Sequence, residues 1–198
     1  MYNKDLNSTL YKYLNTFNFL NTGGINIMNK ELWDKCVEFH GHECPGLAIG
    51  FKASLYAQEL LDIDFSEDEE VVCISENDAC GIDAIQVITG CTAGKGNFIF
   101  HITGKHAYSF YDRKNEKSLR LVLKKIDNEM SREEVFDYVQ NSKAEDLFDV
   151  KNTSLELPEK ASIYKNITCD CCKEDTAEAF ITEKDGKLLC LDCLDKIS

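Results

Sequence analysis

Four cysteines near the end of the chain have the residue types and the spacing of a structural zinc site. They form two C-x2-C pairs, at positions 169–172 and 190–193. Each pair makes a tight turn that aims two thiolates at one point, and four thiolates complete the tetrahedron that Zn²⁺ prefers. We therefore predict that structural zinc is bound by Cys169, Cys172, Cys190 and Cys193.

A further cysteine, Cys171, leaves the ligand set open to alternatives. A shifted set could include it, although the adjacent Cys171 and Cys172 would make awkward joint ligands. An iron–sulfur cluster or unligated thiols are the alternatives to zinc. The run between the pairs contains Asp185-Gly186, which is typical of a β-hairpin turn. We expect a small four-cysteine zinc ribbon or treble clef over residues 169–198.

The charge of the chain argues against a nucleic-acid partner. The formal net charge is −13, and acids also outnumber lysines within residues 169–198. Four thiolates around one Zn²⁺ would add about −2 more, since each ligand must be deprotonated. Such a surface repels phosphate. A zinc-finger transcriptional regulator is therefore the weakest hypothesis, and a structural or protein-docking role for this unit is favoured.

A second group of ligand-type side chains lies in the first half of the chain. His40, His42 and Cys44 fall in a turn rich in glycine and proline, and Cys80 stands where a strand gives way to a helix. Imidazole and thiolate bind zinc and other transition metals. We predict a second metal on His42, Cys44 and Cys80, with His40 as a supporting or alternative ligand. The alternative is that the glycines shape the turn and the histidines only form hydrogen bonds.

Cys80 also supports a hypothesis in which the protein is an enzyme. A thiol near the start of a helix can serve as a thiolate nucleophile, with His40 or His42 as its base. Alternatively, an open position on a core metal could admit water or a substrate. The sequence leaves open whether the protein is an enzyme.

The glycine-rich run 90–96 resembles a phosphate-binding loop only superficially. It has three residues between Gly90 and Gly94, followed by Lys95-Gly96, whereas the Walker pattern has four residues between its glycines. It also runs from helix to strand, whereas the Walker pattern runs from strand to helix. A weaker anion contact through Lys95 remains as a hypothesis. The alternative is that the glycines only make the turn.

The elements that must position these side chains alternate between helix and strand. A capping box at Ser131 and Glu134 predicts one helix start, and the short Gly104-Lys105 link predicts a hairpin between two strands. We expect helices before His40, after Pro45 and over 82–88, and strands over 71–75, 97–103, 107–111 and 118–123. The expected order is an N-terminal extension (1–27), an α+β core (28–150), a linker (151–168) and the zinc-binding domain (169–198).

Composition limits the class of protein. The 198 residues are 43% hydrophobic, and no run approaches the roughly 20 apolar residues of a membrane helix. The N-terminus has no apolar signal-peptide core. Ten cysteines therefore indicate metal or thiol chemistry in a reducing cytoplasm. His101 and His106 fall in a strand pattern and its turn, and we expect them to be structural or solvated.

Three motifs occur in order: FHGHECPGLAIGFKA, NDACGIDAIQVITGCTAGKGN and GKHAYSFYDR. Together they resemble the FmdE family, named after formylmethanofuran dehydrogenase, from about Cys36 to about Leu123. The resemblance implies an α+β core that dimerises, followed in some members by a small zinc domain. It also implies that the motif positions line one shared pocket: His40, His42, Cys44, Cys80, Asp83, Cys91, Lys95 and Lys105.

The family name derives from molybdenum or tungsten enzymes that process one-carbon units on methanofuran. A chain of 198 residues holds none of the large cofactor-binding apparatus that their catalytic chains require. We therefore expect a cytoplasmic, zinc-binding accessory protein, which the resemblance links to redox or one-carbon metabolism. We expect a homodimer, with a partner protein docking through the C-terminal domain.

Overall fold

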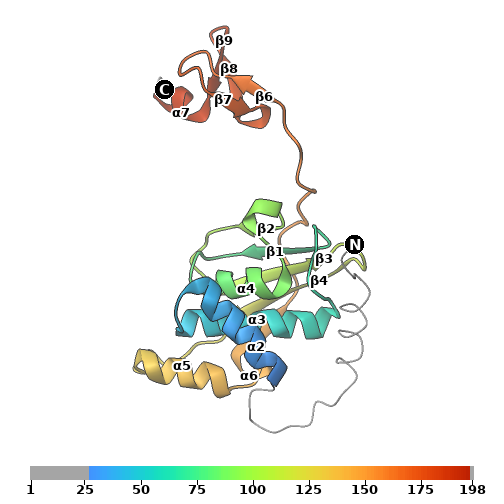
Figure 1. Ribbon diagram of the computed structural model, residues 1–198, viewed down its shortest axis with the longest axis vertical. Helices are drawn as coiled ribbons and strands as arrows, with labels where there is room; N and C mark the ends of the chain where they lie inside the picture. The colour runs from blue at the N-terminus through green and yellow to red at the C-terminus, as the bar shows by residue number, and fades with distance from the viewer. Residues whose placement is uncertain (1–26, 197–198) are drawn as a thin grey trace, which may run out of the picture.

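The computed structural model describes residues 27–196, so the extension expected at 1–27 lies outside them except for its last residue. Helices pack on one face of a five-stranded sheet, and a small unit with two β-hairpins follows (Figure 1). This is the predicted α+β class. The helices are α2 (Ile27–His40), α3 (Pro45–Leu61), α4 (Gly81–Thr89), α5 (Arg132–Asn141), α6 (Ala144–Leu147) and α7 (Leu191–Asp195), with short 3-10 turns at Ala93–Lys95 and Glu178–Phe180. No helix within 27–196 has both the length and the apolar composition to cross a bilayer.

The sheet is mixed, with the order β2-β1-β3-β4-β5. β1 pairs with β2 in parallel, through a crossover that contains α4, and with β3 in the antiparallel sense. β4 and β5 extend the antiparallel part. The strands are β1 (Val71–Ser75), β2 (Phe98–Phe100), β3 (Ala107–Asp112), β4 (Lys117–Leu123) and β5 (Phe148–Lys151).

The hairpin predicted across Gly104-Lys105 is wrong. β1 lies between β2 and β3, so the two strands that flank this link do not pair. Every residue of β1 is buried, and a strand of that kind belongs in the middle of a sheet, with hydrogen bonds on both sides. The sequence does not predict β5, because its residues are mostly exposed and form a strand only by pairing with β4.

Close approach of two glycines sets the distance between α3 and α4. A Cβ placed on Gly50 would lie 1.9 Å from the carbonyl oxygen of Gly81, and one on Gly46 would lie 3.1 Å from Cβ of Cys80. Gly50 therefore has no room for a larger residue, and the contact at Gly46 is tight. The two helices therefore start side by side, which brings Cys80 next to the residue that precedes α3.

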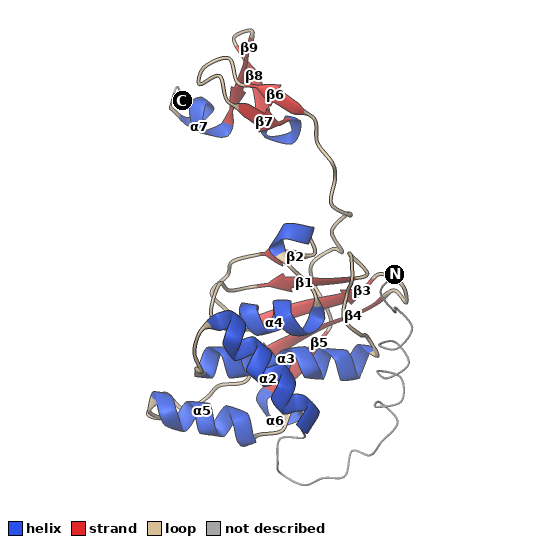
Figure 2. Cartoon of the chain, viewed as in Figure 1, coloured by secondary structure: helices blue, strands red, loops and turns tan. Residues whose placement is uncertain are grey.

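The main hydrophobic core lies between this helical layer and the sheet (Figure 2). Strand residues alternate in direction, so one set of side chains from each strand enters this core. Its largest fully buried members include Leu47, Ile85, Tyr108, Phe110, Leu121, Leu147 and Val139.

The reverse face of the sheet is covered by the chain that follows β5. Val72, Ile74 and Tyr111 form a second buried cluster there, and Leu155 packs against it. The Tyr111 hydroxyl donates to the carbonyl of Leu155 at 2.7 Å. Further along, Arg113 Nη2 donates to the carbonyl of Pro158 at 2.7 Å. The first part of the predicted linker is thus fastened to the sheet.

The C-terminal unit consists of two hairpins and a short helix. The second hairpin turns at Asp185-Gly186, where both residues have positive φ values of 53° and 72°, as a type I′ turn requires. This confirms the predicted turn, and α7 begins directly after Cys190. The strands are β6 (Asn166–Thr168), β7 (Asp175–Ala177), β8 (Ile181–Lys184) and β9 (Lys187–Cys190).

Candidate metal centres

Cys44 is held at the start of α3. It is the N-cap residue, with extended backbone, and its Sγ accepts a hydrogen bond from the Leu47 amide at 3.3 Å. Pro45 follows at the first helical position, where its missing N–H costs nothing. The thiol is buried, so its direction is fixed by the helix start.

His40 is the last residue of α2, and its ring is held by a carboxylate. Its Nδ1–H donates to Oδ2 of Asp83 at 2.7 Å, and its Nε2 faces Sγ of Cys44 at 3.7 Å. The imidazole is 11% exposed. A carboxylate on one ring nitrogen fixes the tautomer and leaves the other nitrogen free to ligate. Asp83, in the first turn of α4, is therefore an orienting group for His40.

The donor atoms of His40, Cys44 and Cys80 all lie within 4.8 Å of one another. The three residues come from the ends of three helices, so the fold rather than local sequence assembles them. One imidazole and two thiols suit zinc or another borderline transition metal. Three protein ligands leave one tetrahedral position for a further ligand.

The sequence pattern favours His42 over His40 as the histidine of this group. The group that the structure brings together contains His40, and the His42 ring stacks beside it with centroids 4.6 Å apart. His42 is exposed, whereas His40 is fixed by Asp83. The roles of both histidines as ligands or catalytic groups stay predictions.

The state of Cys80 bears on the enzyme alternative. Burial raises the pKa of its thiol, and the neighbouring Cys44 raises it further. A thiol with a raised pKa is mostly protonated at neutral pH and is a poor nucleophile. Either role of Cys80, as a nucleophile or as a metal ligand, therefore requires a neighbouring group that stabilises its thiolate.

Tyr108 is a candidate that sequence reasoning missed. A Cβ on Gly81 would lie 2.9 Å from its hydroxyl, so this oxygen sits directly beneath the start of α4. The hydroxyl is buried without a hydrogen-bond partner among the described residues, and burial raises its pKa to about 12. It is a neutral donor beside Cys80. Only its place in the third motif could have pointed to it.

Within one chain the structure does not bring all of the motif residues together, so the shared pocket stays a prediction. Cys91 lies beyond the far end of α4, where its Sγ donates to the Val71 carbonyl at 3.4 Å. Lys95 donates from Nζ to the Ser66 carbonyl at 2.7 Å and so braces a loop. Helix α4 separates both residues from Cys80 by roughly 1.5 Å per residue of its length. The anion contact suggested for Lys95 stays a hypothesis.

The C-terminal cysteines form the second group. The sulfurs of Cys169, Cys172, Cys190 and Cys193 lie within 4.8 Å of one another. Backbone N–H groups, first that of Cys190, lower the pKa of Cys169 to about 6, which favours its thiolate. Cys171 is exposed and is not part of the group. Four sulfurs so arranged can bind a metal such as zinc.

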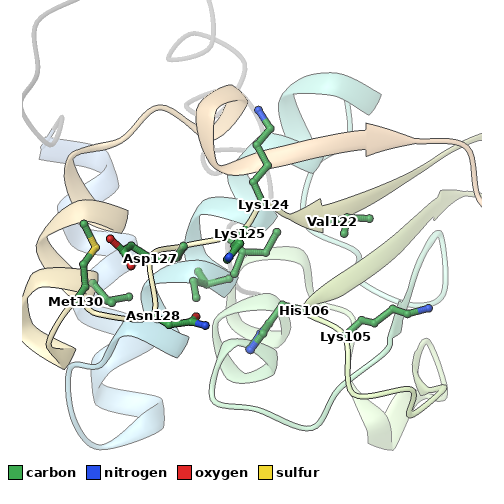
Figure 3. A pocket seen from close by; sticks show the side chains of 12 residues that line it. Lys105, His106, Val122, Lys124, Lys125, Asp127, Asn128 and Met130 are labelled. Atoms are coloured by element: carbon green, nitrogen blue, oxygen red, sulfur yellow. The ribbon is translucent and has the colours of Figure 1, made fainter.

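A separate hollow of about 560 Å³ lies between the end of β4, the chain that follows it and α3. Figure 3 shows His106, Lys125, Asp127 and Asn128 around it. Lys124 also lines it but is engaged elsewhere, since its Nζ donates to the Glu145 carbonyl at 2.8 Å. The hollow combines charged and amide groups with an apolar wall.

Comparisons with known proteins agree on the family. The sequence profile described as "FmdE, Molybdenum formylmethanofuran dehydrogenase operon" matches residues 39–168. A solved FmdE-like protein from Syntrophus aciditrophicus, named after a tungsten formylmethanofuran dehydrogenase, superposes with a TM-score of 0.62 at 25% identity. The match covers 88% of this chain and 98% of that one.

A curated relative is the "Probable S-adenosyl-L-methionine-binding protein" of Archaeoglobus fulgidus. It is 31% identical over 188 residues, which cover 79% of this chain and 50% of the relative. The chain thus spans about half the length of that protein. The profile match covers well over half of the chain and agrees with the fold, so the chain belongs to the FmdE family.

Proposed function

We propose that this protein is a metal-binding accessory protein of the FmdE family, with a transition metal in its core and a structural zinc in its C-terminal unit. The observation that carries the core site is the convergence of His40, Cys44 and Cys80 within 4.8 Å. The Asp83 carboxylate on the far nitrogen of His40 supports it, since metal-bound histidines are commonly oriented in this way.

The surrounding residues suit a centre that receives a ligand. A metal held by three protein groups keeps a position for a fourth and acts there as a Lewis acid. The Leu47 amide orients the Cys44 sulfur, and Asp83 orients His40. The buried Tyr108 hydroxyl provides a neutral hydrogen-bond donor below Cys80.

The cellular setting is part of the same proposal. All ten cysteines are free, which suits a reducing cytoplasm. The family description and the Syntrophus relative connect this kind of protein by name to formylmethanofuran dehydrogenases, and hence to one-carbon and redox metabolism. A homodimer, with a partner protein on the C-terminal unit, completes the proposal.

Metal content of the full chain tests the core site. We expect about two metal equivalents in the wild type by mass spectrometry, and about one in Cys80→Ser. The matched control is Cys171→Ser, which replaces an exposed cysteine outside both groups and should keep two. One equivalent in the wild type that persists in Cys80→Ser would overturn the core site.

Metal content also shows which histidine is a ligand of the core metal. His40→Ala should lose the core metal and His42→Ala should keep it, because only His40 has its ring fixed toward Cys44. The reverse result would move the ligand to His42 and leave the rest of the site in place.

Binding of S-adenosylmethionine is a second candidate function. The name of the Archaeoglobus relative suggests it, and the 560 Å³ hollow has the volume of a small-ligand site. Asp127 and Asn128 offer groups for ribose hydroxyls, and Ile126 offers an apolar surface. Calorimetric titration of the full chain tests it. Saturable binding that Asp127→Ala weakens would support this function, and no heat would exclude it.

A further inference from the structure

A small polar cavity of about 260 Å³ lies on the reverse face of the sheet. Its floor comes from the end of β1 and from β4, and its roof is formed by Ser154 and Leu155 of the segment that leads to the C-terminal unit. Side chains alternate along β1, so Glu76 faces this cavity on the same side as Ile74. The core metal candidate lies on the opposite side, among the helices.

A buried ion pair forms the floor. The side chain of Glu76 is 6% exposed and that of Arg120 is 14% exposed, with Arg120 Nε and Glu76 Oε1 2.5 Å apart. The Thr103 hydroxyl donates to Oε2 of Glu76 at 2.9 Å. Both carboxylate oxygens are therefore occupied, and the hydrogen bond from Arg120 holds the pKa of Glu76 below its usual value. Glu76 acts as a fixed anchor for the guanidinium.

The cationic groups around the cavity are only partly used. Among the described residues, Arg120 makes its hydrogen bond through Nε alone, which leaves its two terminal nitrogens available. Lys105 Nζ is 3.9 Å from Glu76 and 62% exposed, and His101 also lines the cavity. Two permanent cations face one carboxylate, in a chain whose net charge is −13. This local excess of positive charge favours an anion with planar or tetrahedral oxygens.

The segment that covers the cavity is held in place by hydrogen bonds to the sheet. Leu155 is fixed by the hydrogen bond from Tyr111, and Thr153 lies 3.2 Å from Ser118 through their hydroxyl oxygens. A ligand below Ser154 would contact the sheet and this segment at once. The cavity therefore has cationic donors on its floor and is partly covered by this segment.

We propose that this cavity binds a small oxyanion, the phosphate or carboxylate group of a metabolite, on Arg120 and Lys105. The bound anion fastens the segment around Ser154 to the sheet. The proposal is independent of the metal sites, because none of their ligands lines the cavity.

Calorimetric titration of the full chain with inorganic phosphate, and separately with succinate, tests the proposal at constant ionic strength. We expect saturable binding of at least one of the two, and the better ligand identifies the source of the oxyanion. Lys105→Ala should weaken it by about tenfold or more, the usual effect of losing one charged hydrogen bond. The matched control is Lys117→Ala, an exposed lysine on β4 outside the cavity, which should bind as the wild type does.

Trypsin digestion tests the effect on the roof. The ligand should slow cleavage after Lys151 and Lys160, which flank the roof, in the wild type but not in Lys105→Ala. Failure of both anions to bind saturably, or equal binding by Lys105→Ala and the wild type, would overturn the site. Unchanged cleavage would overturn the fastening of the segment. Metal content should be the same in all variants, which separates this test from that of the metal sites.

Discussion

The core cysteines and the C-terminal cysteines lie in differently built regions of the chain. Cys44 and Cys80 border a large hydrophobic cluster that also contains Trp33, Phe51 and Phe110. Among the described residues, the buried cluster of the C-terminal unit consists of Leu189 and two of the candidate zinc ligands. A unit this small cannot be held by apolar burial alone. We therefore expect the first region to fold without a metal and the second to need one.

The two regions also use cysteine differently as a candidate metal ligand. In the C-terminal unit all four positions of a tetrahedron have a cysteine, so a bound metal is closed to other ligands. In the core only three donors converge, and a carboxylate orients one of them. Closed sites serve stability, and open sites serve binding or chemistry.

The largest expected effect is the loss of the C-terminal metal. Structural zinc contributes roughly 10–16 kcal/mol in small domains, so Cys193→Ser should unfold residues 166–196 and leave the core folded. Amide NMR of the full chain would register the loss of dispersed signals from this unit only. Simultaneous loss of core signals would show that the two regions are not separate.

The close contact between the glycines of α3 and α4 should matter for the stability of the core. Gly50→Ala should destabilise the core by about 1–3 kcal/mol, because its Cβ would overlap the Gly81 backbone. Urea unfolding followed by Trp33 fluorescence measures this. Gly94→Ala is the matched control, since nothing lies within 4 Å of its Cβ. Equal stability of the two variants would contradict the close packing.

Asp83→Asn should affect the core metal but not the fold. Loss of the carboxylate beside His40 should weaken metal affinity by about 10–100-fold, as is usual for groups that orient a metal ligand. Competition with a chelator measures the affinity. Asp78→Asn, which changes an exposed aspartate near Cys80, should have no effect. Similar metal affinities in both variants would show that Asp83 does not orient His40.

The smallest expected effect concerns the ion pair between Glu76 and Arg120 in the core. The folded pKa of Glu76 lies below its ordinary value of 4.5, so its ion pair stabilises the fold above that pH. The stabilisation should be lost as the pH falls below 4.5 toward the folded pKa. Glu76→Gln should flatten this part of the stability profile in urea unfolding. An unchanged profile would show that Glu76 titrates alike in both states.

The sequence was sufficient where the signal was local. The two C-x2-C pairs, the Asp185-Gly186 turn and the capping box at Ser131 depend on residues a few positions apart, and the structure has the last two as predicted. The grouping of the four paired cysteines also agrees with the spacing. Short-range geometry decides each of these features.

The sequence was insufficient where distant segments meet. The order of β1, β2 and β3 depends on which strand is buried on both sides, and adjacency along the chain suggested a different pairing. The pairing of Glu76 with Arg120 joins residues 44 positions apart. His40 and His42 cannot be separated by spacing, because the choice depends on Asp83 in another helix.

The chain between the core and the C-terminal unit is short, which limits how far the unit can move away from the core. The Ala161 amide donates a hydrogen bond to the Glu69 carboxylate of the core, and the Tyr164 ring makes an edge-to-face contact with Phe180 of the unit. Between them lie only Ser162 and Ile163, and Ile163 is fully exposed at 102%. The pivot therefore spans about 11 Å at most. So short a tether keeps the two regions at an effective mutual concentration on the order of millimolar, and a partner that touches one meets the other almost without further cost in entropy.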